Sequence, residues 1–399
     1  MARNIIALLA CFASGSLAAA DWTQFRGPDG NGIAIEDKTP AQLSHQQLAW
    51  KVDLPGRGLS SPVVIGDRIF LTASSGQRQN RLHVLAFDAR SGRRIWQRTF
   101  WATGPALSHP KSCMAAPTPA SDGRRLVVLF ATNDLVCVDL EGNVQWVRSL
   151  FDENPKTSDN RGLASSPVIA GDTAVVQMDT QNDAFAVGID LATGKNRWHV
   201  QRSRDINWST PIVLRGKTPA EDLVLLQGTA HLTACAPATG KEVWKLSYGG
   251  HPMASSCVAS KILYVPGEKG LAAFELSGRT APKQLWEKPK LNPDTSSPLA
   301  LNGHVHVLRG SILATGDAKT GELTGQLRLK GQFSSSLVSA GGLLYCFNES
   351  GLAQVVKPGE KDGTLVGSRD LGETILCTPA IAGGALYVRS DHHMWKFGG

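Results

Sequence analysis

The sequence predicts an all-β protein that folds as an eight-bladed β-propeller of four-stranded antiparallel blades. Two short phrases recur along the chain, and no segment of comparable length has helical periodicity. Internal repeats with periods of about 20 to 50 residues are typical of propellers and solenoids, and short, evenly spaced strands favour the propeller.

The first recurring phrase is a turn followed by a tryptophan, as in GIDLATGKNRWHV at residues 188–200. It joins an Asp, a Thr-Gly or Ser-Gly pair and, four residues later, a Trp. Full copies occupy residues 87–96 and 189–198, and residues 235–244 match them with Ala236 in place of the Asp. Residues 138–146 are a shorter copy and residues 274–286 a longer one. Residues 316–321 keep the turn but have Gly325 where the Trp would fall.

The second phrase is a small polar residue, mostly followed by Pro and two apolar residues. Its copies begin at Ser61, Ala116, Ser166, Thr210, Ser256, Ser297, Ser336 and Thr378. The steps between them run from 39 to 55 residues, a period typical of propeller blades. Eight copies therefore predict eight blades.

One complete unit can be followed from residue 60 to residue 100. Its four strands are expected at residues 60–65, 68–73, 82–88 and 94–100, with a hairpin turn at Gly66-Asp67. The last unit has three strands before the chain ends, and residues 48–54 resemble a fourth strand. The N- and C-terminal strands are thus predicted to close the ring, which removes open sheet edges.

The phrase itself has a structural explanation. The Asp carboxylate can accept main-chain N–H groups in the turn, and Gly can adopt positive φ there. The repeated tryptophans are expected to pack between neighbouring blades, each burying roughly 150–250 Å². They are Trp50, Trp96, Trp146, Trp198, Trp244 and Trp286.

Composition and the N-terminus indicate a globular, exported protein. The chain has 399 residues, 42% hydrophobic and 19% charged, with a formal charge of +7 carried by scattered basic residues, which argues against nucleic-acid binding. Residues 1–20 have the pattern of a signal peptide cleaved after Ala20, and lipidation at Cys11 is the alternative. The predicted organisation is this signal peptide, an N-terminal extension at residues 21–47 and the propeller at residues 48–399, in a periplasmic or secreted monomer.

Six cysteines remain after the predicted cleavage, and several lie in apolar stretches. This pattern favours buried thiols over a disulfide framework, although export permits disulfides. They are Cys113, Cys137, Cys235, Cys257, Cys346 and Cys377.

The two phrases together resemble the pyrroloquinoline-quinone (PQQ) repeat family over nearly all of residues 48–397, and residues 21–30 (DWTQFRGPDG) resemble the start of exported PQQ-like propellers. The resemblance implies one of two functions. Some members are dehydrogenases that oxidise alcohols or sugars with PQQ and Ca²⁺, whereas BamB-like members are non-catalytic factors in outer-membrane barrel assembly. Fold alone does not separate these functions.

The parts that the resemblance implies for a dehydrogenase are absent from the sequence. It has no adjacent Cys-Cys pair and no convincing acidic cluster for calcium. Residues 29–32 (DGNG) faintly resemble a calcium loop but lack the later Glu, so a plain turn is expected. His304 and His306 should share one strand face, as half of a metal site would, but no third ligand is evident. We therefore predict no catalytic residue and no metal ligand.

Segments just before each first strand should reach the rim of a central funnel, and they vary from unit to unit. The rim residues predicted to bind a ligand or partner are Arg57, Arg161, Asn207, Trp208, His251, Asp294, Gln332 and Glu373, with ordinary solvated loops as the alternative. Two long irregular segments, residues 101–114 and 150–163, are expected to form a lip for protein contact.

The sequence thus favours a non-catalytic propeller in the cell envelope that binds an envelope protein or a small ligand at its funnel, without nucleic acid, cofactor or transmembrane segment. The alternative is a PQQ-dependent quinoprotein oxidoreductase, which would require PQQ with calcium.

Overall fold

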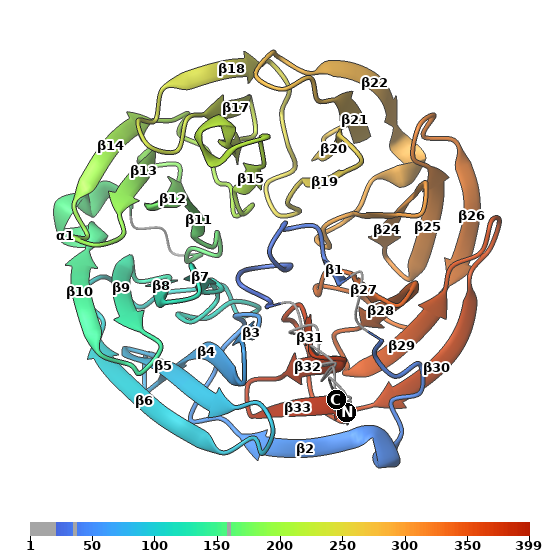
Figure 1. The fold of residues 1–399 in the computed structure, drawn as a ribbon, viewed down its shortest axis with the longest axis horizontal. Helices are drawn as coiled ribbons and strands as arrows, with labels where there is room; N and C mark the ends of the chain where they lie inside the picture. Colours follow the sequence, from blue (N-terminus) through green and yellow to red (C-terminus); the bar gives the residue numbers. More distant parts are fainter. Residues whose placement is uncertain (1–20, 35–37, 158–160) are drawn as a thin grey trace, which may run out of the picture.

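The computed structural model describes residues 21–34, 38–157 and 161–399, and the predicted signal peptide with Cys11 lies outside these residues. The described chain forms a ring of eight antiparallel blades, so the predicted eight-bladed β-propeller is confirmed (Figure 1). No helix among the described residues is long and apolar enough to cross a membrane.

The strands of each blade follow one another from the inside of the ring outward. Blade 1 contains β3 (Val63–Ile65), β4 (Arg68–Ser75), β5 (Arg81–Asp88) and β6 (Arg94–Trp101). Blade 2 contains β7 (Ala120–Ser121), β8 (Arg125–Leu129), β9 (Asp134–Asp139) and β10 (Val144–Ser149). Blade 3 contains β11 (Val168–Ala170), β12 (Thr173–Asp179), β13 (Ala184–Asp190) and β14 (Asn196–Gln201). Blade 4 contains β15 (Ile212–Leu214), β16 (Leu223–Gln227), β17 (Leu232–Cys235) and β18 (Glu242–Leu246).

The second half of the ring repeats this order. Blade 5 contains β19 (Cys257–Ala259), β20 (Ile262–Gly267), β21 (Gly270–Glu275) and β22 (Lys283–Lys288). Blade 6 contains β23 (Leu299–Leu301), β24 (His304–Arg309), β25 (Ile312–Asp317) and β26 (Leu323–Arg328). Blade 7 contains β27 (Val338–Ala340), β28 (Leu343–Phe347), β29 (Leu352–Lys357) and β30 (Thr364–Asp370). Blade 8 contains β31 (Ala380–Ala382), β32 (Ala385–Arg389), β33 (His393–Gly398) and, outermost, β2 (Leu48–Asp53).

The described helical segments are short. They are α1 (Leu150–Glu153) and the 3-10 turns η1 (His45–Gln47), η2 (Pro155–Thr157), η3 (Pro219–Glu221) and η4 (Pro289–Leu291).

The ring closes as the sequence predicts, because β2 pairs antiparallel with β33. Two repeat positions differ from the prediction. The inner strand of blade 2 begins at Ala120, so the residue equivalent to Ser61 is Thr118 and not Ala116. In blade 5 the strand begins at Cys257, which makes Ser255 the equivalent residue instead of Ser256. Both errors arise because a neighbouring Pro or Ser gives a similar residue pattern one or two positions away from the true start of the phrase.

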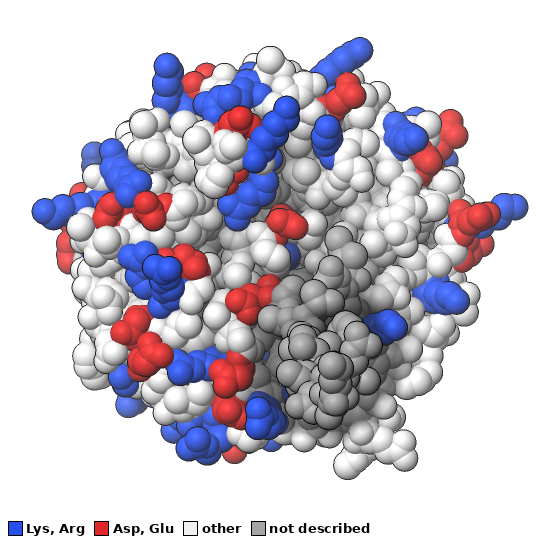
Figure 2. Space-filling model, in the orientation of Figure 1, with Lys and Arg blue, Asp and Glu red and all other residues white. Residues whose placement is uncertain are grey.

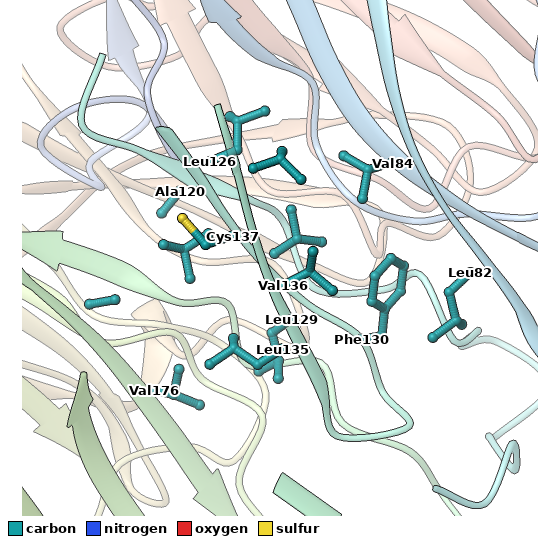
Figure 3. Packing of buried hydrophobic residues seen from close by; sticks show 14 of the residues in the cluster. Leu82, Val84, Ala120, Leu126, Leu129, Phe130, Leu135, Val136, Cys137 and Val176 are labelled. Atoms are coloured by element: carbon teal, nitrogen blue, oxygen red, sulfur yellow. The ribbon is translucent and has the colours of Figure 1, made fainter. Parts of the chain in front are cut away.

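The cores lie between blades, where the second and third strands are covered on both faces. In Figure 3, Leu82 and Val84 of β5 face Leu126, Val136 and neighbouring side chains of blade 2, and Val176 of β12 continues the layer. This burial on both faces explains why these strands are continuous apolar runs. The six cysteines of the described chain are buried free thiols, as their apolar flanks predict.

The recurring phrase provides a contact between adjacent blades that we call the Trp–turn contact. The indole N–H of a Trp on one outer strand donates to a carbonyl in the turn of the next blade, and that turn's glycine packs against the ring. Trp96 Nε1, for example, donates to Leu140 O at 2.9 Å, and a Cβ on Gly142 would lie 2.8 Å from the ring. The predicted packing role of the repeated phrase is confirmed at this joint.

The Asp of the phrase stabilises the turn from within, as predicted. In blade 3, Asp190 Oδ1 accepts hydrogen bonds from Thr193 N and Oγ1, while Arg197 donates to Oδ2. The bond from Arg197, followed by those from Thr193, lowers the pKa of the Asp190 carboxyl to about 2.

Residues 21–34 enter the ring and run across its centre (Figure 1). Trp22 pairs with Val64 of blade 1, Thr23 O accepts from Ser121 N of blade 2, and β1 (Ile33–Ala34) pairs parallel with β27 of blade 7. Arg26 is fully buried and its Nη2 donates to Asn31 O at 3.0 Å and to Pro298 O of blade 6. This segment therefore fills part of the central channel.

The face of the ring shown in Figure 2 carries Lys and Arg next to Asp and Glu around its edge, with much uncharged surface between them. No extended region of one charge sign is visible in that view. This distribution agrees with the solvated surface expected from the scattered basic residues.

Candidate functional site

The inner strands all start at one end of the channel, and a hydroxyl residue lies two positions before each strand. Seven of these hydroxyls, which we call the hydroxyl ring, each accept a main-chain N–H from the preceding blade at 2.9–3.1 Å. The hydroxyl ring consists of Thr118, Ser166, Thr210, Ser255, Ser297, Ser336 and Thr378. It connects the blades in sequence around the axis.

The circle is interrupted between blades 8 and 1. Ser61 occupies the eighth position, but its buried Oγ has no partner. The two blades are joined instead by Arg389 of β32, a fully buried side chain whose Nη1 donates to Thr72 O at 2.6 Å and to Ser60 Oγ at 3.2 Å. Burial lowers the pKa of this guanidinium from its usual value.

The hydroxyl ring surrounds a cavity of about 300 Å³ that we call the funnel. Phe25 contributes to its wall from the N-terminal segment, and Leu59, Trp208, Met253 and Leu376 add apolar surface. Its basic lining residues are His109, Lys111 and Arg161, and the thiol-bearing Cys377 also lines it. No carboxylate is among the described residues that line it.

A long loop, residues 102–114, lies on one side of the funnel. It makes up most of residues 101–114, one of the two segments expected from the sequence to form a lip, and we call it the lip. At its start, Thr103 Oγ1 donates to Asp134 Oδ1 at 2.7 Å, and Thr132 Oγ1 donates to Oδ2 at 2.6 Å. Burial raises the pKa of Asp134, although these bonds oppose the shift. The loop is thus attached to blade 2 at its base.

The far part of the lip contacts three other regions. His109 N donates to Arg161 O at 3.1 Å, which joins the two long segments that the sequence singles out. Lys111 Nζ forms an ion pair with Glu349 of blade 7 at 2.8 Å. Pro110 O accepts from Arg57 Nη2 at 2.5 Å. The lip therefore spans from blade 2 to blade 7 beside the funnel.

The predicted rim residues do not form one site. Arg161 and Trp208 line the funnel, and Trp208 Nε1 donates to Gly162 O at 2.9 Å. Asn207 is buried between blades 3 and 4, where its Nδ2 donates to Asp179 Oδ2 at 3.0 Å.

The other five lie away from the funnel lining. Arg57 pairs with Asp391 at 3.0 Å, and Glu373 pairs with Lys51 at 3.1 Å and contacts His393. His251 lines a cavity of about 460 Å³ beside blades 4 and 5, and burial lowers its pKa. Asp294 and Gln332 line a third cavity, of about 580 Å³, next to blade 6.

Sequence reasoning did not recognise that the hydroxyl ring and the cationic residues of the lip surround one cavity. The repeated Ser and Thr were visible in the sequence, but their regularity indicated strand starts and not a common cavity. Lys111 lies in the segment expected to form a lip, and its partner Glu349 is 238 residues away. No local pattern in the sequence connects these two residues.

The residues present do not fit a resident calcium ion in the funnel. Calcium binds six to eight oxygen ligands, usually with several carboxylates. The funnel offers hydroxyls and cationic groups, and no group of three or more His, Cys, Asp or Glu suited to a metal occurs within residues 21–34, 38–157 and 161–399. Residues 29–32 form tight turns in which Asn31 Oδ1 accepts from Ile33 N at 3.0 Å.

The two histidines on β24 make contacts within blade 6. His306 is buried and its Nδ1 lies 3.0 Å from Thr315 Oγ1, while the ring of His304 is 6.4 Å away. Burial lowers the pKa of His306 to about 4. The neutral imidazole is therefore part of the blade 6 core.

A family model described as "Outer membrane protein assembly factor BamB" matches residues 41–245 and 182–311. The chain belongs to this PQQ-like repeat family. Among solved structures, BamB from Moraxella catarrhalis is similar with a TM-score of 0.64 at 17% identity, covering 88% of this chain and 97% of that one. A protein titled europium-containing methanol dehydrogenase has a TM-score of 0.71 at 12% identity, covering 92% and 89%. These likenesses establish the propeller fold.

Two curated relatives are polyvinylalcohol dehydrogenases. The protein from Pseudomonas sp. is 23% identical over 176 residues, and that from Sphingopyxis sp. (strain 113P3) is 26% identical over 170 residues. Each alignment covers 40% of this chain and about a quarter of the relative. The chain is therefore similar both to proteins named for assembly and to proteins named for oxidation.

Proposed function

We propose that this protein is an exported, non-catalytic propeller that binds a partner or ligand at the funnel as a scaffold of the cell envelope. The observation that carries the proposal is the chemistry of the funnel, whose described lining is apolar, hydroxylic and cationic, without a carboxylate. Such a lining can bind a ligand but offers no carboxylate to serve as a general base or as a calcium ligand.

Family membership and coverage support this function. The match to the BamB family model extends over residues 41–311, and the structure of Moraxella catarrhalis BamB aligns along nearly its whole length. The predicted export signal at residues 1–20 is consistent with a periplasmic location. Partner capture at the funnel would explain why a chain of this family retains an open cavity beside the lip.

Site-specific photo-crosslinking tests this proposal. A photoreactive residue replaces Met253, which lines the funnel and is 40% exposed, in the full-length protein in intact cells. The control position is Leu365, which is 47% exposed on the outer strand β30. We expect a discrete adduct from position 253 and none from position 365. Equal labelling from both positions, or no adduct from 253, would contradict the proposal.

A second candidate, a PQQ-dependent oxidoreductase acting on an alcohol or sugar, is favoured by the alignments to polyvinylalcohol dehydrogenases. Lys111 and Arg161 would be the residues to hold the anionic edge of PQQ, which would supply the two-electron oxidation when bound. The absence of carboxylates from the described lining speaks against calcium beside it. Calorimetric titration with PQQ, with and without Ca²⁺, tests this candidate, and calcium-dependent binding followed by dye-linked oxidation would favour it over the scaffold.

A further inference from the structure

The hydroxyl ring contains seven donors that no protein acceptor uses. A hydroxyl has one donor and two acceptor sites, and each of these oxygens already accepts a main-chain N–H. Within the described residues, none of the seven donates a hydrogen bond to another protein group. The accepted bond already satisfies each buried hydroxyl, so the seven O–H groups remain available to hydrogen-bond with a molecule in the cavity.

All seven hydroxyls line the same cavity. Their residues are between 2% and 7% exposed, so bulk water reaches them poorly. The arrangement follows from the repeat, because each blade places the equivalent hydroxyl at the start of its inner strand. The protein thus presents a circle of hydroxyl groups around the axis.

The basic residues around this circle favour a negatively charged ligand. The basic lining residues are His109 and Lys111 from the lip and Arg161 from the second long segment, and no acidic residue is among the described residues of the lining. Lys111 is already paired with Glu349, which does not line the cavity. A carboxylate accepts hydrogen bonds at both oxygens and donates none, so it complements hydroxyl donors and cations together.

The apolar lining residues indicate which kind of group should lie next to the negative group of the ligand. Phe25, Met253 and Leu376 lie in the same lining as the hydroxyls. A volume of about 300 Å³ is small for a ligand site and suits a terminal group better than an extended chain. The complementary group is therefore a carboxylate with an apolar neighbour.

We propose that the funnel binds a carboxylate through the hydroxyl ring, with Arg161 providing positive charge and the apolar wall selecting its neighbour. The inference deepens the proposed scaffold function by naming the chemistry recognised at that site. Two sources share this chemistry: the C-terminus of a partner polypeptide and a free small carboxylic acid.

Titration calorimetry with three probes separates these sources. The probes are an acetylated tripeptide that ends in phenylalanine with a free carboxylate, the same peptide as its C-terminal amide, and citrate. We expect the free acid to bind at least about tenfold more tightly than the amide, because hydrogen bonds to a charged group are stronger than those to a neutral one. Binding of citrate alone would assign the carboxylate site to a small acid and would overturn the selection of an apolar neighbour by the wall.

Matched variants test whether the hydroxyls and the charge are responsible. Thr210→Val removes one O–H, whereas Thr210→Ser keeps it and is expected to retain binding. Arg161→Gln removes a funnel cation, and its control Arg204→Gln removes a cation that is 63% exposed and outside the funnel lining. We expect Thr210→Val and Arg161→Gln each to weaken free-acid binding about fivefold or more, and both controls to change it less than about twofold.

Thr210 also accepts Ser166 N at 3.1 Å, so circular dichroism and the unfolding midpoint must first show that Thr210→Val is folded. Equal binding of acid and amide, no binding of any carboxylate, or unchanged binding by folded Thr210→Val and Arg161→Gln would overturn the proposal. If crosslinking from position 253 still captures a partner in that case, the scaffold function survives while carboxylate recognition fails. If carboxylates bind but no partner is captured, the scaffold function fails instead.

Discussion

Two kinds of joint hold neighbouring blades together, and they depend on the recurring phrase to different degrees. Within the described ring, five joints have the complete Trp–turn contact, in which the indole donates to the next turn at 2.6–3.3 Å and the turn glycine packs on the ring. Their tryptophans are Trp50, Trp96, Trp146, Trp198 and Trp286. The other three joints lack part or all of this contact.

The other three joints are packed in different ways. Between blades 4 and 5, Trp244 is buried but its Nε1 has no partner, and Gly278 in the longer turn has no neighbour within 4 Å of a built Cβ. Between blades 6 and 7, Gly325 takes the Trp position and the backbone of Lys361 lies against it. Between blades 7 and 8, Gly367 takes that position and Ala41 of the N-terminal extension packs there. A joint can thus be closed by an aromatic ring or by backbone packing directly on a glycine.

We call the two joints closed by backbone packing on Gly325 or Gly367 the glycine joints. They should tolerate substitution least. In Gly325→Ala the new Cβ would lie 1.3 Å from Lys361 O, so the backbone of blade 7 must move. We expect the free energy of unfolding to fall by more than about 3 kcal/mol, at the upper end of overpacking effects. Urea unfolding of the purified variant measures this change.

Gly303→Ala is the matched control, because its Cβ would meet nothing within 4 Å but its φ of +77° still strains a side chain. It should cost about 1 kcal/mol. Similar losses in the two variants would show that the glycine joint is not closely packed.

The complete and incomplete tryptophan joints can be compared directly. Trp198→Ala and Trp244→Ala remove side chains that are 8% and 5% exposed, so each should cost about 3–5 kcal/mol. Trp198 also loses its bond to Pro237 O, whereas Trp244 has no such bond to lose. We therefore expect Trp198→Ala to be the more destabilised by about 1 kcal/mol in urea unfolding. A larger loss in Trp244→Ala would contradict the importance of the contact.

Blade 6 lies between a complete tryptophan joint and a glycine joint, and its buried His306 makes stability depend on pH. The folded pKa of about 4 is below the ordinary 6.5, so between these values the unfolded chain binds a proton that the folded chain does not. Stability should therefore fall as pH decreases from 6.5 to 4, by on the order of 3 kcal/mol from this group. Unfolding midpoints measured across this range test the slope.

His306→Gln should flatten this part of the pH profile, and His304→Gln on the same strand is the control because its side chain is less buried. An unchanged slope in His306→Gln would assign the pH dependence to other groups.

The sequence predicted the fold well because the repeat records the same local contacts many times. The turn at Asp190 and the hairpin after Ile65 depend on neighbours within a few residues, so their patterns are visible locally. The central channel was different, since Arg26 contacts Pro298 across 272 residues. Such a contact has no periodic signal and no single-sequence pattern.

The candidate site was predicted only in part, because contacts between distant segments leave no pattern in a single sequence. Segments before the inner strands were correctly expected to reach the rim, yet Arg161 and Trp208 alone among the eight predicted residues line the funnel. Variation between repeats identified residues that differ, such as Asn207, but this residue differs because it satisfies Asp179 and Gln227 O in a buried network. Variation in sequence therefore reflected both local packing and access to the cavity.

The smallest expected change in stability concerns the lip, which is attached to blade 7 by an ion pair instead of by packing. Lys111 and Glu349 are 61% and 24% exposed, and exposed pairs contribute about 0–1 kcal/mol. Lys111→Gln should consequently leave the unfolding midpoint almost unchanged but speed amide exchange close to position 111, which loses its ion pair with blade 7 while the bonds of His109 and Pro110 remain. Exchange at Thr103 should not change, because its bonds to Asp134 remain. A marked loss of global stability, or slow exchange throughout the lip, would mean that packing beneath the loop holds it in place without the ion pair.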